Sequence, residues 1–203
     1  MRFVDSAEKF GSFVTLAGAL VDASKNIPNN VFTEKLNLFL FITFDEVRMR
    51  VFFSHLKNFL ERIGETEFIY LVVDPMPDDY LCEDIKKYKA IEFSTSDNDN
   101  QFISALNEYS GGSVPDSIMD NSDQILIMSK SQEWCVFADR DSDIAVCAFS
   151  TQRFYENFKS EYGEDLLPST EAAAEYAYGE RNDTEKIRLL IKNYSSQNAK
   201  LQK

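Results

Sequence analysis

EFIYLVV, residues 67–73, is the most strongly β-forming segment of this chain. From Phe68 onward its side chains are apolar at every position rather than at alternate ones, so both faces of the strand require cover. Asp74-Pro75-Met76-Pro77 ends the strand, because proline lacks the amide hydrogen that a strand ladder needs. The segment predicts a strand in the middle of a sheet that helices bury on both sides.

Helical and extended patterns precede this strand. Apolar residues recur at helical spacing over 5–23, and alternating leucines predict a strand over 36–42. Thr43 with Glu46 predicts a capping box that opens a long helix. Because a strand, a helix and a strand then follow one another over 36–73, we expect a crossover between parallel strands.

The second half of the chain predicts shorter elements. They are a short helix over about 78–88, a strand at 90–93, a helix capped by Ser96 or Asp97, strands at 125–128, 134–138 and 144–149, and helices to residue 194. The expected fold is α/β, bordering on α+β. It consists of one domain over 1–194, with a mixed sheet flanked by helices, an antiparallel hairpin near 134–149, a helical C-terminus and a polar tail over 195–203.

The three cysteines are an odd number and lack the spacing of metal ligands. Two hairpin registers are open. If Ala138 pairs with Ile144, Cys135 and Cys147 lie opposite each other on one face, whereas the alternative register separates them. We expect reduced thiols in a cytoplasmic protein.

Net charge excludes several classes of ligand. A formal charge of −13 disfavours nucleic acid and anionic membrane surfaces, because phosphates would be repelled. The N-terminal residues include acids that interrupt a secretory signal, and the longest apolar run, 38–42, is far shorter than a membrane span. We therefore expect a cytoplasmic protein that binds neither nucleic acid nor membrane.

The negative charge is concentrated in the middle of the chain. Residues 64–145 contain 18 acidic residues and 5 basic ones, whereas the two flanks together contain 16 of each. A surface built from this region would attract a basic protein partner. The candidate contacts, chosen because we expect them at loops or helix ends, are Asp78, Asp79, Asp97, Asp99, Asp139, Asp141 and Asp143.

Catalytic and metal-binding signatures fail where their geometry is strictest. The only histidine is His55, and no G-x-S-x-G motif accompanies it. The acidic run 139–143 has Ile144 and Ser150 where a calcium loop needs glycine and glutamate. No glycine-rich phosphate cradle follows any predicted strand. We expect no catalytic residue, no metal and no cofactor.

Two alternatives to a binding protein stay open. Carboxylates at 74–79, after the central strand, could serve a hydrolase, because strand ends often carry active sites. A structural or regulatory subunit could instead associate through an apolar interface formed by Phe154, Phe158 and Tyr162. The sequence leaves the oligomeric state open.

The segment WCVFADRDSDIAV, residues 134–146, resembles a hairpin of small bacterial proteins in which a Trp-bearing strand leads through an acid–Arg turn into an apolar strand. This hairpin is similar to one in immunity-type proteins, which neutralise toxins of interbacterial competition. The resemblance covers these residues only and assigns no functional side chain. It implies a stoichiometric inhibitor whose partner is a toxin domain, and many such toxins are nucleases with basic active sites.

Overall fold

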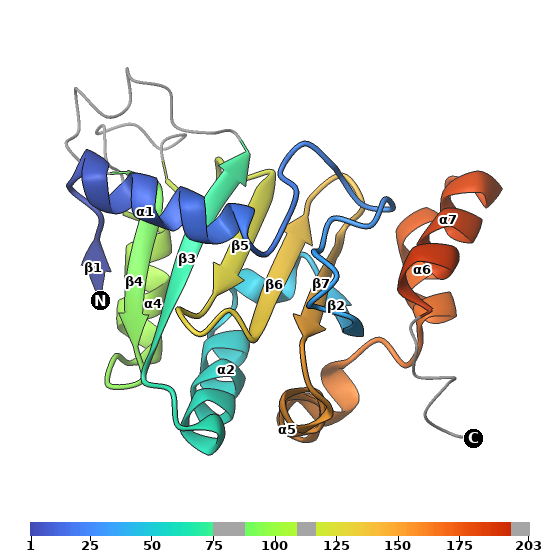
Figure 1. Ribbon diagram of the computed structural model, residues 1–203. Coiled ribbons are helices and arrows are strands. Elements are labelled where there is room, and N and C mark those ends of the chain that lie inside the picture. Colours follow the sequence, from blue (N-terminus) through green and yellow to red (C-terminus); the bar gives the residue numbers. More distant parts are fainter. Residues whose placement is uncertain (75–87, 109–116, 196–203) are drawn as a thin grey trace.

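A seven-stranded sheet forms the centre of the protein (Figure 1). The computed structural model describes residues 1–74, 88–108 and 117–195. Every neighbouring pair of strands is antiparallel. In spatial order the strands are β1 (Arg2–Phe3), β4 (Ala90–Ser94), β3 (Glu67–Asp74), β5 (Gln124–Met128), β6 (Trp134–Asp139), β7 (Ile144–Phe149) and β2 (Leu38–Thr43).

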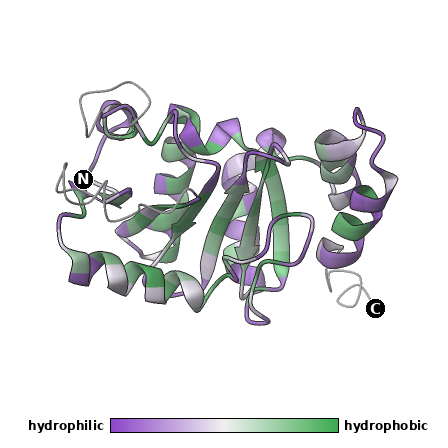
Figure 2. Ribbon diagram, turned by 90° about the horizontal axis from the view of Figure 1, so that it is seen from above, coloured by the Kyte–Doolittle hydropathy of each residue, from purple (hydrophilic) through white to green (hydrophobic). Residues whose placement is uncertain are grey.

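Helices cover both faces of the sheet, as the view from above shows (Figure 2). One face packs against α2 (Arg50–Ile63), α4 (Asp99–Leu106) and α5 (Gln152–Tyr162). The other face packs against α1 (Ala7–Gly18), α6 (Thr170–Tyr178) and α7 (Thr184–Tyr194). Two short 3₁₀ helices, η1 (Asp45–Arg48) and η3 (Gly163–Asp165), complete the described elements. The structure confirms the predicted α/β fold and its single domain.

The central strands are buried on both sides, as the apolar run at 67–73 predicts. β5, β6 and β7 are buried at every residue. On the α2 face the ring of Phe59 lies 5.5 Å from Trp134 and 5.3 Å from Phe158, in edge-to-face geometry. Each phenylalanine of this kind contributes about 1.5–3 kcal/mol by leaving water. Two hydrophobic cores, one on each face, therefore fix which way every strand faces.

The predicted crossover over 36–73 is present, but its two strands are not neighbours. β2 and β3 run in the same direction, and α2 connects them. The later strands β5, β6 and β7 lie between them: β5 pairs antiparallel with β3, and β7 pairs antiparallel with β2. The expected parallel pairing is therefore wrong, because a meander from farther along the chain fills the gap.

The long helix predicted from Thr43 is interrupted. Glu46 accepts a hydrogen bond from the Thr43 backbone N–H at 2.8 Å, which is half of a capping box. The chain then makes the 3₁₀ turn η1, and Met49 is extended before α2 begins. Gly64 ends α2 in the left-handed conformation at φ 81°, as a helix-terminating glycine does.

The cap of α4 is Asn98 rather than the predicted Ser96 or Asp97. The Asn98 side chain accepts from the Gln101 N–H, and Gln101 accepts from the Asn98 N–H in return. Asp97 is not available, because its carboxylate accepts from the Ser94 N–H and from the N-terminal ammonium. A competing local turn thus decides the cap.

The hairpin adopts the register that separates the two cysteines. Ala138 pairs with Ala145, so Cys135 lies opposite Ala148 and Cys147 lies opposite Val136. The four-residue turn 140–143 sets this pairing: the Asp143 N–H donates to the Arg140 carbonyl, and Asp143 is left-handed at φ 56°. The two thiols belong to opposite cores of the sheet.

Two of the predicted segments lie outside the described residues. They are most of the helix expected over 78–88 and residues 196–203 of the tail. Within the described ranges, no helix is both long and apolar enough for a transmembrane span.

The register predicts the chemistry of the two thiols. In a Cys82→Ser variant, Cys135 and Cys147 should stay unmodified by a thiol reagent and should not join under mild oxidation. Both are fully buried, burial raises the pKa of each thiol, and they face different sides of the sheet. Thiol titration before and after denaturation measures this. A disulfide formed in the folded protein would contradict the register.

Candidate functional site

The sheet register brings carboxylates together at one end of the strands. Asp74 pairs with Gln124, and Gln124 pairs with Asp139 on the next strand. The β6–β7 turn adds Asp141 and Asp143 beside them, because Asp139 pairs with Ile144. We name this surface the acidic end, comprising Asp45, Glu46, Asp74, Asp120, Asp123, Asp139, Asp141 and Asp143.

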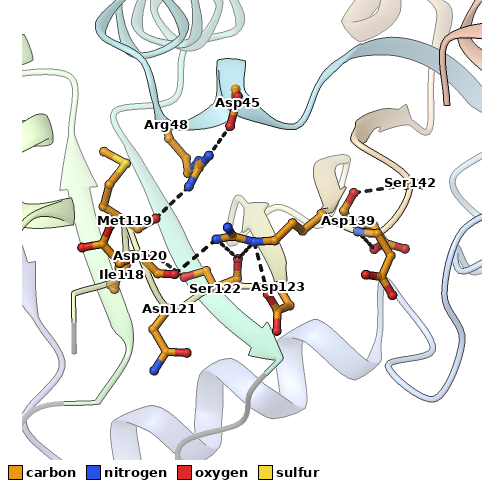
Figure 3. Close-up of polar contacts among 12 residues, drawn as sticks. Asp45, Arg48, Ile118, Met119, Asp120, Asn121, Ser122, Asp123, Asp139 and Ser142 are labelled. Atoms are coloured by element: carbon orange, nitrogen blue, oxygen red, sulfur yellow. Dashed lines mark hydrogen bonds and ion pairs between the residues drawn. The ribbon is translucent and has the colours of Figure 1, made fainter. Parts of the chain in front are cut away.

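Two arginines at the acidic end hold the segment 117–123 in place (Figure 3). The Arg48 guanidinium donates to the Met119 carbonyl at 2.7 Å and also contacts Asp45. Arg140 donates to the Ser122 carbonyl from two nitrogens, at 2.7 and 3.0 Å, and lies 3.1 Å from an Asp123 oxygen. These arginines therefore serve as backbone clamps as well as counter-charges.

The ring of Phe44 lies close to both clamps. The Arg48 guanidinium carbon is 4.7 Å from the ring centre, and that of Arg140 is 5.2 Å away. A cation over an aromatic face is held by the ring quadrupole, so the Phe44 ring helps to hold both guanidinium groups. The outer side chains of the acidic end, Asp141 among them, are exposed.

Asp139 is the buried member of the acidic end. Its side chain accepts from the Ile27 N–H at 3.2 Å and from the Asp141 N–H at 3.1 Å. The residue is 2% exposed, and burial raises the pKa of its carboxyl to about 6. Asp139 thus joins the hairpin turn to the loop that follows α1.

The opposite end of the sheet also contains acids, but there they are paired with cations. Lys130 lies 3.2 Å from Glu67 and 3.2 Å from Glu92, and Lys35 lies 2.7 Å from Glu133. Glu92 also contacts Lys9. These three lysines come from the N-terminal flank and from the turn after β5. The local charge at this end is therefore close to balanced.

Carboxyl pKa values shift in opposite directions at the two ends. At the paired end the Lys35 ammonium, together with the Ser150 hydroxyl, holds the pKa of Glu133 below its usual range. At the acidic end burial raises the pKa of Glu46, although the Thr43 N–H acts against this, and Asp165 adds repulsion. At the acidic end Glu46 and Asp139 therefore have raised carboxyl pKa values, chiefly because both are buried.

The candidate contacts divide between surface and interior. Asp141 and Asp143 are exposed and adjacent, as expected. Asp99 is half-buried and accepts from the Ser54 hydroxyl at 3.2 Å. Asp78 and Asp79 lie outside the described residues.

The expected exposure of Asp97 and Asp139 is wrong. Asp97 is 6% exposed and lies 2.7 Å from the N-terminal ammonium, so it is a structural ion-pair partner near β1. Asp139 is buried because the loop after α1 folds over the end of β6. The burial of these two residues leaves no periodic apolar pattern in the sequence, because in both cases a distant segment supplies a hydrogen-bond donor to the carboxylate.

Sequence reasoning missed Asp45, Glu46 and Tyr176 as parts of this surface. The Tyr176 hydroxyl donates to Asp143 at 3.2 Å, and its side chain is 46% exposed. Met49 and Val51, at the start of α2, are also large exposed apolar residues. All lie outside 64–145, so the charge count over that region could not indicate them.

The apolar interface expected from α5 is not available. Phe158 and Tyr162 are buried, with ring centres 4.3 Å apart, and Tyr162 also packs on Phe52 of α2. Phe154 is partly buried against the same core. His55 lies 3.2 Å from Asp165, and its ring centre is 4.8 Å from that of Tyr162, with the two rings tilted by 40°. These residues hold α5 against α2.

Among the described residues, no group of three or more histidines, cysteines and acids is placed to hold a metal ion. Comparison with protein-family models, curated proteins and solved structures gives no match. The resemblance of residues 134–146 to immunity-type proteins therefore stays a prediction.

Burial of Asp139 predicts a pH-dependent stability difference. Its folded pKa of about 6 lies above the ordinary 3.8, so charging it disfavours folding as the pH rises through this interval. The free energy of unfolding of Asp139→Asn, measured relative to that of wild type, should therefore increase by about 1 kcal/mol as the pH is raised from about 5 to about 8. Urea unfolding at both pH values measures this difference.

The matched control is Asp141→Asn, two residues away on the same turn and exposed. The pH-dependent gain should be confined to Asp139→Asn. Equal behaviour of the two variants would show that the Asp139 carboxyl is not desolvated.

Proposed function

We propose that this protein is a non-catalytic binding protein that masks a basic partner, as an immunity protein masks its toxin, through the acidic end. The observation that supports this most strongly is the difference between the two ends of the sheet. Glu67, Glu92 and Glu133 have lysine partners at one end. Exposed Asp120, Asp141 and Asp143 cluster at the other, where the arginines bind backbone carbonyls.

Such a surface has the physical properties of a docking site for cations. Complementary potential accelerates encounter with a basic partner and disfavours acidic ones. Exposed apolar side chains supply the contacts that slow release, and Tyr176 is hydrogen-bonded to the acidic turn through Asp143. A nuclease-type toxin with a basic active site is the partner class that this combination favours, with the protein acting in the bacterial cytoplasm.

The hydrolase alternative depends on a carboxyl group with a raised pKa that faces substrate. Asp139 has a raised pKa at a strand end, which is the observation in its favour. However, its carboxylate is buried and accepts from the backbone N–H groups of Ile27 and Asp141. Those contacts give Asp139 a structural role, so binding is the better proposal.

Affinity capture at two ionic strengths tests the proposal. The tagged protein should retain a basic partner from a lysate of its source bacterium at about 50 mM salt and lose most of it at about 500 mM. The Asp141→Asn/Asp143→Asn double variant should recover about tenfold less of the same partner at low salt, because it removes two exposed charges of the acidic end.

The matched control is Glu34→Gln/Glu61→Gln, which removes two exposed charges away from the acidic end. It should recover as much partner as wild type. Failure to retain any basic protein at low salt, or equal loss in both double variants, would contradict the proposal.

A further inference from the structure

A cavity of about 590 Å³ lies on the face of the sheet that α1 covers. Its apolar lining comes from three segments: α1, the loop that follows it, and β3. The apolar side chains that line it are those of Val14, Ala17, Val21, Phe32, Leu71 and Val73. Leu71 and Val73 are buried strand residues, so the cavity reaches the sheet itself. Its volume falls within the range of small-molecule sites.

The polar part of the lining carries no net charge. Asp22 and Lys25 both line the cavity and form an ion pair at 3.0 Å. The Ser24 hydroxyl and Lys25 lower the pKa of Asp22 to about 2, so its carboxylate is ionised at neutral pH. One fixed negative charge and one positive charge therefore stand side by side, and a charged ligand gains no net attraction.

Hydrogen-bonding capacity is left over at this site. The Asp22 side chain is 46% exposed, so its oxygens can accept from a further donor. Thr33 also lines the cavity, and its hydroxyl is buried without a hydrogen-bond partner. An apolar cavity with a few polar groups at one side orients a ligand that is itself mostly apolar.

We propose that this cavity binds a small, uncharged, ring-containing molecule whose single N–H or O–H group donates to the Asp22 carboxylate. The rings would lie against Leu71 and Val73, and the donor would lie at the Asp22–Lys25 pair. No residue of the acidic end lines the cavity, and the inference does not depend on the proposed function.

Binding of N-phenyl-1-naphthylamine tests the cavity, because this probe is uncharged, carries one N–H and fluoresces in apolar surroundings. The wild-type protein should bind it saturably with one molecule per chain. Gly18→Trp and, separately, Val14→Trp should weaken binding at least about tenfold by filling the cavity. Gly18 accepts a larger side chain, since a Cβ atom there meets nothing within 4 Å.

Gly11→Trp is the matched control. Gly11 lies on the same helix, has equal space around its Cβ position and does not line the cavity. It should bind the probe within about twofold of wild type. Circular dichroism confirms that each variant is folded. Absence of saturable binding to wild type, or unchanged binding in both cavity variants, would overturn the proposal.

Competition between two ligands of equal size tests the donor. 1-Naphthol should displace the probe at about fivefold lower concentration than 1-methylnaphthalene, because one hydrogen bond replaces a methyl contact. A purely apolar cavity predicts the opposite order, since the hydroxyl would lose its water without compensation. That order would overturn the assigned role of Asp22. Neither result bears on capture of a basic partner, so the two proposals fail independently.

Discussion

Burial of both faces of an antiparallel sheet is the constraint on which the rest of this structure depends. Every residue of β5, β6 and β7 is buried, so a shift of one residue in register would exchange the side chains of the two cores. Charged groups are thereby excluded from the faces of the sheet and gather at its two ends. The register then decides which carboxylates share an end, and it places Asp74 and Asp139 in one row with Gln124 between them.

The two ends of the sheet differ in how their acidic side chains are paired with cations, and this difference makes one end more negative than the other. Lysines neutralise glutamates at one end, whereas Arg48 and Arg140 at the other end bind backbone carbonyls and pack against the ring of Phe44. An arginine used in this way rigidifies a loop while leaving exposed carboxylates nearby. Buried Asp139 adds a further constraint, because it connects the hairpin turn to the loop after α1 through the Ile27 N–H.

Local patterns predict the elements well and their partners less well. The segment 67–73 and the hairpin strands are found where apolar runs place them, because burial on both faces leaves a direct mark in sequence. The register of the hairpin depends instead on turn geometry at 140–143. One of the two neighbours of β3 is β5, which lies about 50 residues farther along the chain. Capping by Asn98 likewise depends on Asp97 being engaged elsewhere.

The candidate surface is predictable only in part for the same reason. A charge count along the chain finds Asp141 and Asp143, but it cannot tell that Asp97 and Asp139 are buried by donors from distant segments. It also cannot find Asp45 or Tyr176, which reach the acidic end from the flanks through contacts with Arg48 and Asp143. Tertiary contact, rather than local composition, assembles this surface.

The local electrostatic potential at the two ends tests this account most directly. Cationic and anionic nitroxide cosolutes report that potential through the relaxation of individual amide protons. At neutral pH the cationic probe should be strongly favoured at the amides of residues 140–143 and much less so at residues 130–133, where lysines balance the glutamates. Equal preference at both turns would contradict the claim that the sheet collects unbalanced negative charge at one end.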